Sequence, residues 1–448
     1  MKWYENAQIY HIFPLGYCGC EKTSIEEINF KFEKILDEVD YLKETGFNTI
    51  LFGPVFESSS HGYDVVDMRK IDNRLGDNFS VKAVVEKLKN SGFKIIFDAV
   101  FNHCGRNNPF FQDLLINREN SKYKNWFYGV DFSNNNKYND GFSYYGWNGD
   151  ISLVKYNLSN EEVVDYLLNS VKYWVDYFDI DGLRLDAADS LDIGFIEKLR
   201  IFSSGIKSDF WLMGEVVHGD YRNWLGDNKL HSVTNYECYK GLFSSHNDKN
   251  YFEIAYSLNR LFGHTGIYKD YKLYNFIDNH DVSRINSVLN SKEHLFPLLI
   301  LLFTIPGIPS LYYGSEFEIK GEKNGNDWIL RPELSLNQMY ENSDKHIVNV
   351  IKKLSSIRNN LDVLKNGNYS QLMVSHQQFF FNMKNEKNHI ITGVNSLNKK
   401  ISVKLKTGNS DDNRVFRDCL NEDREYIEKN GVLKVDLNPN WGVILEQR

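Results

Sequence analysis

Two short stretches, Gly182–Asp186 (GLRLD) and Phe210–Glu215 (FWLMGE), decide the fold that this 448-residue sequence predicts. Each stretch is an apolar run that ends in an acid, and a helical pattern over Asp192–Ser204 lies between them. Strands that are joined by a helical crossover run parallel to each other. We therefore expect the side chains of Asp186 and Glu215 to emerge at the same edge of one sheet.

The same pattern recurs at Ile95–Asp98 (IIFD) and at Asn275–Asp281 (NFIDNHD). Acids at the carboxyl ends of several parallel strands are typical of the active face of a (β/α)8 barrel. Strand candidates alternate with helical patterns, the first of them an amphipathic run over Ile25–Glu44, which favours a closed barrel over an open doubly wound sheet. The predicted fold class is therefore α/β, a (β/α)8 TIM barrel. Its expected strands are Ala7–Phe13, Asn48–Phe52, Lys94–Asp98, Ile180–Asp186, Phe210–Glu215, His231–Tyr236, Leu273–Asp278 and Ile308–Tyr313.

Two segments break this alternation. Residues 103–159 are polar, aromatic and rich in Asn and Gly, and they are too many for an ordinary βα loop, so they predict an excursion domain inserted after strand three. After Gly367 short alternating runs predict antiparallel β structure. The expected division is a barrel of residues 1–102 and 160–364, the excursion domain 103–159 and a C-terminal β-sandwich domain 365–448. The expected C-terminal strands are Gln371–Val374, Gln378–Asn382, His389–Val394, Ile401–Leu405, Val432–Leu437 and Val443–Glu446.

Composition limits the classes of partner. The net charge is −8 and the basic residues are dispersed, which argues against nucleic acid or an anionic membrane as the main partner. The longest apolar stretch, Leu295–Ile305, is too short to cross a bilayer, and the N-terminus lacks the apolar run of a signal peptide. The five cysteines are scattered, which favours a reducing compartment and predicts no zinc site. We therefore expect a cytoplasmic protein that binds neither nucleic acid nor membrane.

Paired carboxylates at a barrel's active face indicate glycoside hydrolysis, in which one acid is the nucleophile and the other donates a proton. Arg184 precedes Asp186 by two residues on one strand, so both side chains point to the same side. Arg184 is expected to hydrogen-bond Asp186, to lower its pKa and to orient it as the nucleophile. Glu215 follows an apolar run without an adjacent cation, so burial is expected to keep it protonated for acid/base catalysis. Asp281, beside His280, is expected to contact sugar hydroxyls.

Four segments together resemble the signature regions of the α-amylase family. They are Asp98–His103 (DAVFNH), Gly182–Asp189 (GLRLDAAD), Gly214–Val216 (GEV) and Phe276–Asp281 (FIDNHD), and they follow the family's order at strands three, four, five and seven. The resemblance implies an enzyme that hydrolyses α-glucans, with no organic cofactor. It implies Asp186 as nucleophile, Glu215 as acid/base and Asp281 as transition-state stabiliser. It also implies that the attacked glucose is contacted by His103, Arg184 and His280.

Two further matches add candidate binding residues. His61–Asp64 (HGYD) is similar to the family's segment after strand two, in which the tyrosine, here Tyr63, stacks on the attacked glucose and the aspartate, here Asp64, supports an arginine. Asp327 and Arg331 match a pair that grips the next sugar outward in many members.

The branch of the family is indicated by Leu153–Asn157 (LVKYN), which resembles the excursion-domain signature of neopullulanases and cyclomaltodextrinases, although Val154 replaces its proline. That branch carries an extra N-terminal β domain, and we expect this sequence to lack it because the barrel pattern begins at Gln8. The expected substrates are maltooligosaccharides and cyclodextrins cleaved at α-1,4 bonds, with pullulan and starch as further candidates. A monomer is slightly favoured over an oligomer.

Several alternatives stay open at this stage. Asp98 is expected to organise the site, by pairing with Arg184 or with a neighbouring residue, rather than to perform chemistry. Asn102 occupies a position that ligates calcium in many α-amylases, but no carboxylate cluster is evident in the excursion, so no metal is expected. The acids after the strands can also be read as helix caps, and the histidines as ordinary buried residues. The same site would suit an α-glucan transglycosylase, and a catalytically inactive carbohydrate-binding protein is a third reading.

Overall fold

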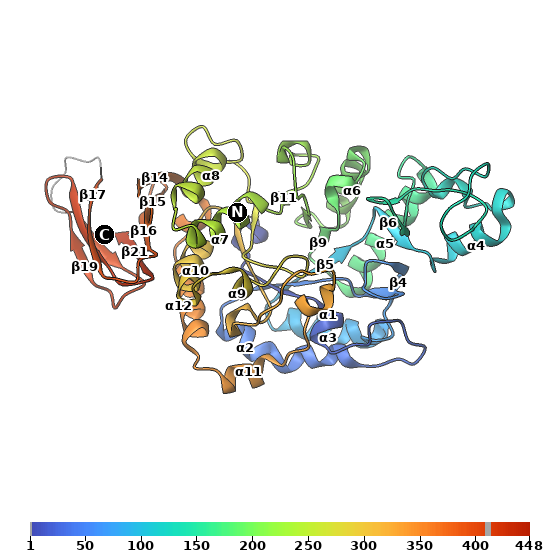
Figure 1. Cartoon of the computed structure of the whole chain (residues 1–448), viewed down its shortest axis with the longest axis horizontal. Helices are drawn as coiled ribbons and strands as arrows, with labels where there is room; N and C mark the ends of the chain where they lie inside the picture. Colours follow the sequence, from blue (N-terminus) through green and yellow to red (C-terminus); the bar gives the residue numbers. More distant parts are fainter. Residues whose placement is uncertain (1, 408–413) are drawn as a thin grey trace.

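The computed structural model describes residues 2–407 and 414–448. At its centre lies an eight-stranded parallel sheet in the order β11-β10-β9-β5-β2-β1-β13-β12. A parallel bridge between Thr234 and Tyr274 joins its two ends, so the strands form a closed barrel in chain order (Figure 1). This confirms the predicted fold class. The strands are β1 (Ile9–Ile12), β2 (Thr49–Phe52), β5 (Lys94–Ala99), β9 (Gly182–Leu185), β10 (Trp211–Gly214), β11 (Ser232–Val233), β12 (Tyr274–Asn275) and β13 (Ile308–Tyr312).

Helices surround the barrel and follow its strands. The longer ones are α3 (Asn78–Asn90), α5 (Glu161–Phe178), α6 (Ile193–Ile206), α7 (Tyr236–Asn247), α8 (Phe252–Phe262), α10 (Leu295–Thr304) and α12 (His346–Asn360), and the shorter ones are α1 (Pro14–Tyr17), α2 (Val39–Glu44), α9 (Ile285–Val288), α11 (Leu336–Asn342) and α13 (Val363–Asn366). In α5 the side chain of Asn160 caps the first turn by accepting a hydrogen bond from the Glu162 N–H, and Asp179 ends the helix in a left-handed conformation.

The first predicted helix is shorter than expected. Helical structure begins at Lys31 rather than Ile25, as a 3-10 helix (Lys31–Glu38) that continues into α2. The backbone N–H groups of Asn29 and Phe32 donate to the carbonyls of Asn73 and Leu75 in the loop after β4 (Val65–Ile71). Because these bonds tie the segment to another loop, they replace the first turns of the predicted helix.

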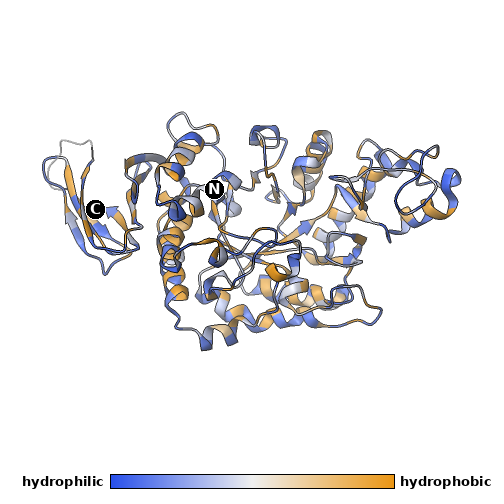
Figure 2. Cartoon of the chain, viewed as in Figure 1, coloured by the Kyte–Doolittle hydropathy of each residue, from blue (hydrophilic) through white to orange (hydrophobic). Residues whose placement is uncertain are grey.

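An apolar core fills the inside of the barrel, with buried side chains that come from six of its strands. A larger apolar core lies between the strands and the surrounding helices. Figure 2 shows the same division along the helices, where hydrophobic stretches alternate with hydrophilic ones. The inner core residues from the six strands are Ile9, Leu51, Ile96, Trp211, Met213, Tyr274 and Ile308.

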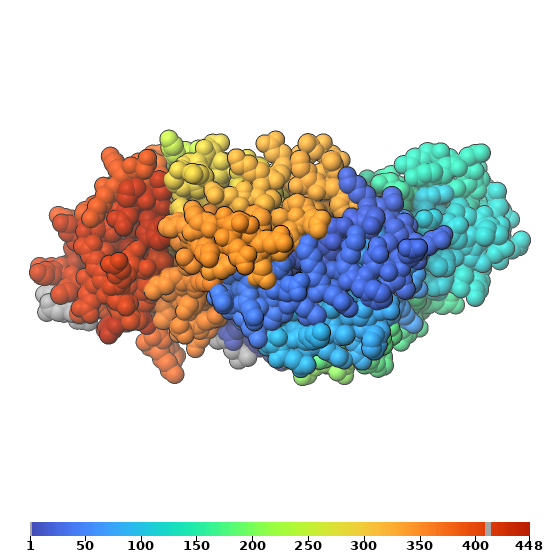
Figure 3. All heavy atoms as spheres, turned by 90° about the horizontal axis from the view of Figure 1, so that it is seen from below, coloured from blue at the N-terminus to red at the C-terminus, as the bar shows by residue number. Residues whose placement is uncertain are grey.

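Residues 103–160 leave the barrel after β5 and form a small three-stranded antiparallel sheet with the helix α4 (Pro109–Asn117). Its strands are β6 (His103–Gly105), β7 (Gly146–Trp147) and β8 (Asp150–Lys155). A separate hairpin, β3 (Phe56–Ser58) with β4, follows β2. The excursion and the C-terminal strands lie at opposite ends of the barrel, in cyan and red in Figures 1 and 3.

The C-terminal part is a sandwich of a six-stranded antiparallel sheet and the two-stranded sheet β17-β20, and buried Phe380 and Ile391 of the first pack with Leu405 and Leu433 of the second. The six predicted strands are present. Two more, β18 and β19, escaped prediction because they are three or four residues long and carry charged side chains. The strands are β14 (Asn368–Val374), β15 (Gln378–Lys384), β16 (His389–Asn395), β17 (Ile401–Lys406), β18 (Val415–Asp418), β19 (Glu425–Ile427), β20 (Val432–Leu437) and β21 (Trp441–Gln447). The domain limits drawn from the sequence stay a prediction.

In the part of the chain that the structure describes, no helix is both long and apolar enough to span a lipid bilayer.

Candidate active site

Strand register places the predicted acids together at the carboxyl ends of β5, β9 and β10. Asp98 lies opposite Arg184, and Leu185 lies opposite Gly214. Asp186 and Glu215 each follow one step beyond that last pair, so they emerge side by side. The expectation that both acids leave the same edge of one sheet is therefore met.

The Arg184 guanidinium lies at the centre of these acids and is 4% exposed. Its Nη1 donates to both oxygens of Asp98, at 2.9 and 2.7 Å, and to Oδ1 of Asp186 at 3.1 Å. Its Nη2 lies 2.7 Å from Oε2 of Glu215. The predicted contacts of Arg184 with Asp98 and Asp186 are therefore present, and one planar cation holds three carboxylates in a fixed arrangement.

Two electrostatic predictions were wrong. Glu215 does have an adjacent cation, since the second nitrogen of Arg184 reaches across from β9 to β10. The pKa of Asp186 is not lowered: burial raises it well above its usual value, and Arg184 opposes this rise without cancelling it. The nearby carboxylates of Glu215, Asp98 and Asp281 add to the rise. Negative charge exceeds positive charge around this guanidinium, and Asp186 therefore holds a proton more strongly than an isolated carboxylate does.

Two contacts that sequence reasoning missed hold Glu215. The backbone N–H of Ala187 donates to Oε2 at 3.2 Å, and the Tyr236 hydroxyl donates to Oε1 at 3.4 Å. Ala187 has a φ of 44°, a left-handed conformation that costs a residue other than glycine about 1–2 kcal/mol. Tyr236 is the last residue of the predicted sixth strand. Its position at the active face could have identified it as a candidate site residue.

Asp281 is held on both of its oxygens by basic side chains. His280 Nε2 lies 2.7 Å from Oδ2, and Arg331 Nη2 lies 3.0 Å from Oδ1. Burial alone would raise the pKa of Asp281, but His280, Arg331 and Arg184 outweigh it and hold the pKa well below its usual range. These neighbours therefore favour the ionised form of Asp281, whereas burial disfavours the ionised form of Asp186.

Arg331 is buried, stacks over the Phe13 ring at 4.4 Å and also donates from Nε to the His280 carbonyl at 3.2 Å. Asp327, whose side chain is 40% exposed, is its more distant partner at 3.6 Å. Both residues line the cavity described below. The structure thus gives Arg331 a role in orienting Asp281, and its predicted grip on an outer sugar stays a prediction.

Tyr63 joins the two halves of the site. Its hydroxyl donates to Asp98 Oδ2 at 3.0 Å, makes a short contact with His280 Nε2, and accepts from Arg184 at 3.4 Å. The Tyr63 and His280 rings are stacked, with centroids 5.6 Å apart. The neighbouring Asp64 accepts hydrogen bonds from the Ser60 hydroxyl and the His61 N–H, so in this structure it organises its own loop.

His103 begins β6, at the base of the excursion. Burial and the nearby His61 lower the pKa of His103 to about 3, so its ring is neutral. Its Nδ1 lies 3.3 Å from the Asn102 side-chain nitrogen, while Nε2 is buried without a hydrogen-bond partner. The ring of Trp147, the last residue of β7, lies 5.9 Å from it. Neutral His103 can therefore offer Nε2 to a ligand.

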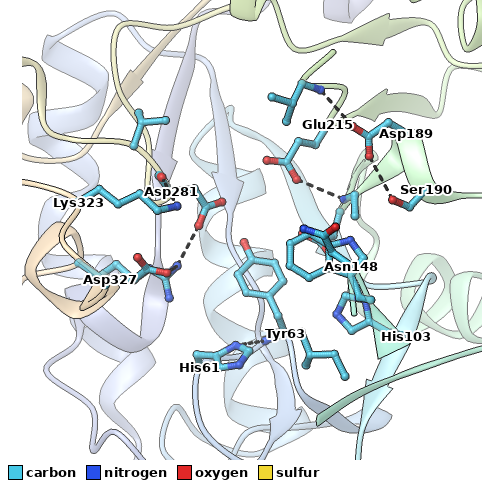
Figure 4. A pocket seen from close by; sticks show the side chains of 18 of the residues that line it. His61, Tyr63, His103, Asn148, Asp189, Ser190, Glu215, Asp281, Lys323 and Asp327 are labelled. Atoms are coloured by element: carbon cyan, nitrogen blue, oxygen red, sulfur yellow. Dashed lines mark hydrogen bonds and ion pairs between the residues drawn. The ribbon is translucent and has the colours of Figure 1, made fainter. Parts of the chain in front are cut away.

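These side chains surround one cavity of about 910 Å³, large enough for several sugar rings. Figure 4 shows Tyr63, His103 and Glu215 facing it, with Asp281 on the other side of Tyr63. Among the residues that line it are Asp186, Arg331 and Asp327. Asp98 and Arg184 lie beneath as a buried polar layer that holds the lining acids.

Residues 31–353 match the family model described as alpha amylase, catalytic domain. The chain is also 31% identical over 434 residues to a cyclomaltodextrinase of Thermoanaerobacter pseudethanolicus. The aligned region covers 89% of this chain and 71% of that protein. The chain belongs to the α-amylase family. As a member of that family it is a glycoside hydrolase.

Other relatives in the α-amylase family are similar over most of the chain. The intracellular maltogenic amylase of Bacillus subtilis is 29% identical, over 90% of this chain and 68% of its own length. Neopullulanase 2 of Thermoactinomyces vulgaris is 28% identical, over 99% of this chain and 78% of its own length. A solved debranching enzyme of Nostoc punctiforme superposes with a TM-score of 0.80 at 26% identity, covering 99% of this chain and 98% of the other.

Asn102 is the calcium candidate that the sequence offers, and the expectation that no metal binds here stays a prediction. Asn102 Oδ1 is buried without a hydrogen-bond partner, so it offers one oxygen. Calcium takes six to eight oxygen ligands. Within residues 2–407 and 414–448, no group of three or more His, Cys, Asp or Glu side chains is placed to hold a metal ion.

Proposed function

We propose that this glycoside hydrolase cleaves α-1,4-glucosidic bonds of maltooligosaccharides and cyclodextrins, with pullulan and starch as further substrates, and that it retains the anomeric configuration. The observation that carries the proposal is the pair Asp186 and Glu215 on two nitrogens of one guanidinium, at the wall of one cavity. Retaining glycosidases need two carboxyl groups about 5–5.5 Å apart, and this arrangement supports such a spacing. The names of the relatives support the substrate class.

The first step needs one proton and one free carboxylate within the pair. Glu215 donates the proton to the glycosidic oxygen as the bond to the anomeric carbon breaks. Asp186 Oδ attacks that carbon from the opposite side and forms a β-glucosyl ester. In the second step Glu215 takes a proton from water, the water oxygen replaces Asp186, and the product has the α configuration.

The remaining residues bind and orient in this proposal. Arg184 fixes the position of both reacting carboxylates. Asp281, kept ionised by its basic neighbours, accepts hydrogen bonds from sugar hydroxyls and stabilises positive charge on the ring in the transition state. His103 and His280 contact the attacked glucose, and the Tyr63 ring stacks on it. No organic cofactor takes part, and a cytoplasmic location is part of the proposal.

The proposal is tested by incubating the protein with maltotriose, β-cyclodextrin, pullulan and starch and separating the products. NMR of the first product should show the α anomer. Asp186→Asn and Glu215→Gln should each lower kcat by at least about 10³-fold, because each removes one of the two chemical groups, while circular dichroism stays unchanged.

Near-normal turnover of either variant, or a β-anomeric product, would refute the assignment. Glu197→Gln, an acid on α6 that does not line the cavity, is the matched control and should leave kcat unchanged. Products longer than the substrate at high maltotriose would favour the transglycosylase alternative, because a sugar rather than water would then have taken the glucosyl group.

A further inference from the structure

A second cavity, of about 880 Å³, lies between α7 and α8 and the loop after β10. Three residues, Val217, His218 and Tyr236, line both this cavity and the active-site cavity. The two spaces are therefore neighbours that share a wall, and the second space, here called the α7–α8 groove, leads away from the reacting acids. In Figure 1, α7 and α8 lie between the barrel and the first C-terminal strands.

The groove leads away on the side of Glu215 rather than of Asp186. Tyr236 lies at the junction of the two cavities, and its hydroxyl donates to Glu215 at 3.4 Å. The acid of a glycosidase stands beside the leaving-group oxygen, whereas the nucleophile stands on the opposite face of the attacked sugar. In the proposed reaction the groove therefore continues from the leaving-group side.

Aromatic side chains line the groove, and the two on α8 are unusually exposed. Phe252 and Tyr256 are four residues apart on α8, so they lie on one face of the helix, and they are 46% and 69% exposed. Tyr239 and Phe243 line the groove from α7, also four residues apart. The two exposed rings on α8, beside the partly buried rings of α7, give flat apolar surfaces that fit the faces of sugar rings.

The charged groups of the groove cancel. Glu237 and Arg260 pair across the two helices, with Oε1 3.0 Å from Nε, and Lys240 and Glu253 are the other charged residues of the lining. Two acids and two bases favour neither an anion nor a cation. They do supply donors and acceptors for a neutral ligand that carries many hydroxyl groups.

We propose that the α7–α8 groove binds the leaving-side end of an α-glucan chain, several sugars beyond the bond that is cut, with Tyr256 and Phe252 as stacking platforms. The inference rests on the proposed function and names the substrate class more closely: a linear glucan long enough to reach from Glu215 to α8. Substrates that end before the groove gain nothing from it, so the enzyme prefers longer chains.

The test compares maltoheptaose with maltotriose for the native protein and Tyr256→Ala. Tyr256 does not line the active-site cavity. Because its side chain is largely exposed, we expect the variant to fold like the native protein. Loss of one stacking ring should raise KM for maltoheptaose about tenfold with kcat within about twofold, and leave both constants for maltotriose unchanged. Tyr256→Phe should restore the native KM, because the ring and not the hydroxyl is needed.

The matched control is Phe79→Ala, which removes an aromatic ring that is 75% exposed on α3 and outside the groove. The inference is overturned if Tyr256→Ala and Phe79→Ala give the same ratio of kcat/KM for the two substrates. If the native protein cleaves neither substrate, the proposed function fails. Calorimetric titration with maltoheptaose then tests whether the groove binds a glucan chain. Binding that weakens about tenfold only in Tyr256→Ala supports it, and equal binding by all three proteins overturns it.

Discussion

Replacing Arg184 by lysine tests whether the planar guanidinium, rather than its charge, arranges the acids. In the structure Nη1 of Arg184 donates hydrogen bonds to Asp98 and Asp186, while Nη2 of the same guanidinium pairs with Glu215. A lysine ammonium is one point of charge on a flexible stem, so it can stay with Asp98 but cannot hold both other acids in place. The positive charge survives the substitution and the geometry does not.

The expected magnitude comes from the contacts that are lost. A hydrogen bond to a charged group contributes about 1.5–3 kcal/mol, and one or two such bonds would no longer form. A loss of about 3 kcal/mol in transition-state stabilisation lowers kcat about 100-fold, since each 1.36 kcal/mol is a factor of ten. We therefore expect Arg184→Lys to lower kcat at least about 100-fold, with a smaller change in KM.

The assay is the steady-state hydrolysis of maltotriose, with circular dichroism and thermal unfolding to confirm that the variant folds. Arg69→Lys is the control, because Arg69 also bonds a hydroxyl and lies against a tyrosine ring, but outside the cavity. A kcat for Arg184→Lys within about fivefold of the native value would show that positive charge alone suffices, and the reasoning from geometry would be wrong.

Two further predictions concern buried groups. Glu316 accepts from the Tyr10 and Tyr41 hydroxyls, and burial raises its pKa to about 7 from 4.5, so the folded protein binds this proton more tightly than the unfolded chain. The free energy of unfolding should therefore fall by up to about 3 kcal/mol as pH rises from about 4.5 to above 7, and Glu316→Gln should remove that fall. Urea unfolding at pH 5 and pH 8 measures it, and parallel pH dependence in the two proteins would contradict it. Tyr236→Phe removes one hydrogen bond to Glu215 and should lower kcat for maltotriose about fivefold; an unchanged kcat would mean that this contact does not orient the acid.

The sequence by itself predicted the barrel and the set of reacting acids. Parallel strands buried on both faces must be continuous apolar runs, and their polar side chains can only appear where the strand ends, as in Gly182–Asp186 and Phe210–Glu215. The pairing of Asp98 with Arg184 also followed, because both residues lie on neighbouring strands. These features depend on local pattern and on chain order, which are both written in the sequence.

Short elements were harder to predict. The strands Val415–Asp418 and Glu425–Ile427 carry too few residues for a period-two pattern, and they exist because β21 pairs with the first of them. The first helix does not begin at Ile25 as predicted, because backbone N–H groups of this segment donate to carbonyls of another loop instead. In both cases a distant part of the chain supplies the partners.

The electrostatics of the site were decided only by the tertiary structure. The sequence predicted that Arg184 would pair with Asp186 and that Glu215 would have no adjacent cation. In the folded chain the register of β9 and β10 brings Glu215 within reach of the same guanidinium. Burial raises the pKa of Asp186, and the crowded carboxylates add to that rise. The sequence determines which charged groups reach the active face. Their pKa values and partners depend on distances of a few ångström between strands, because electrostatic interaction in a buried site changes steeply over that range.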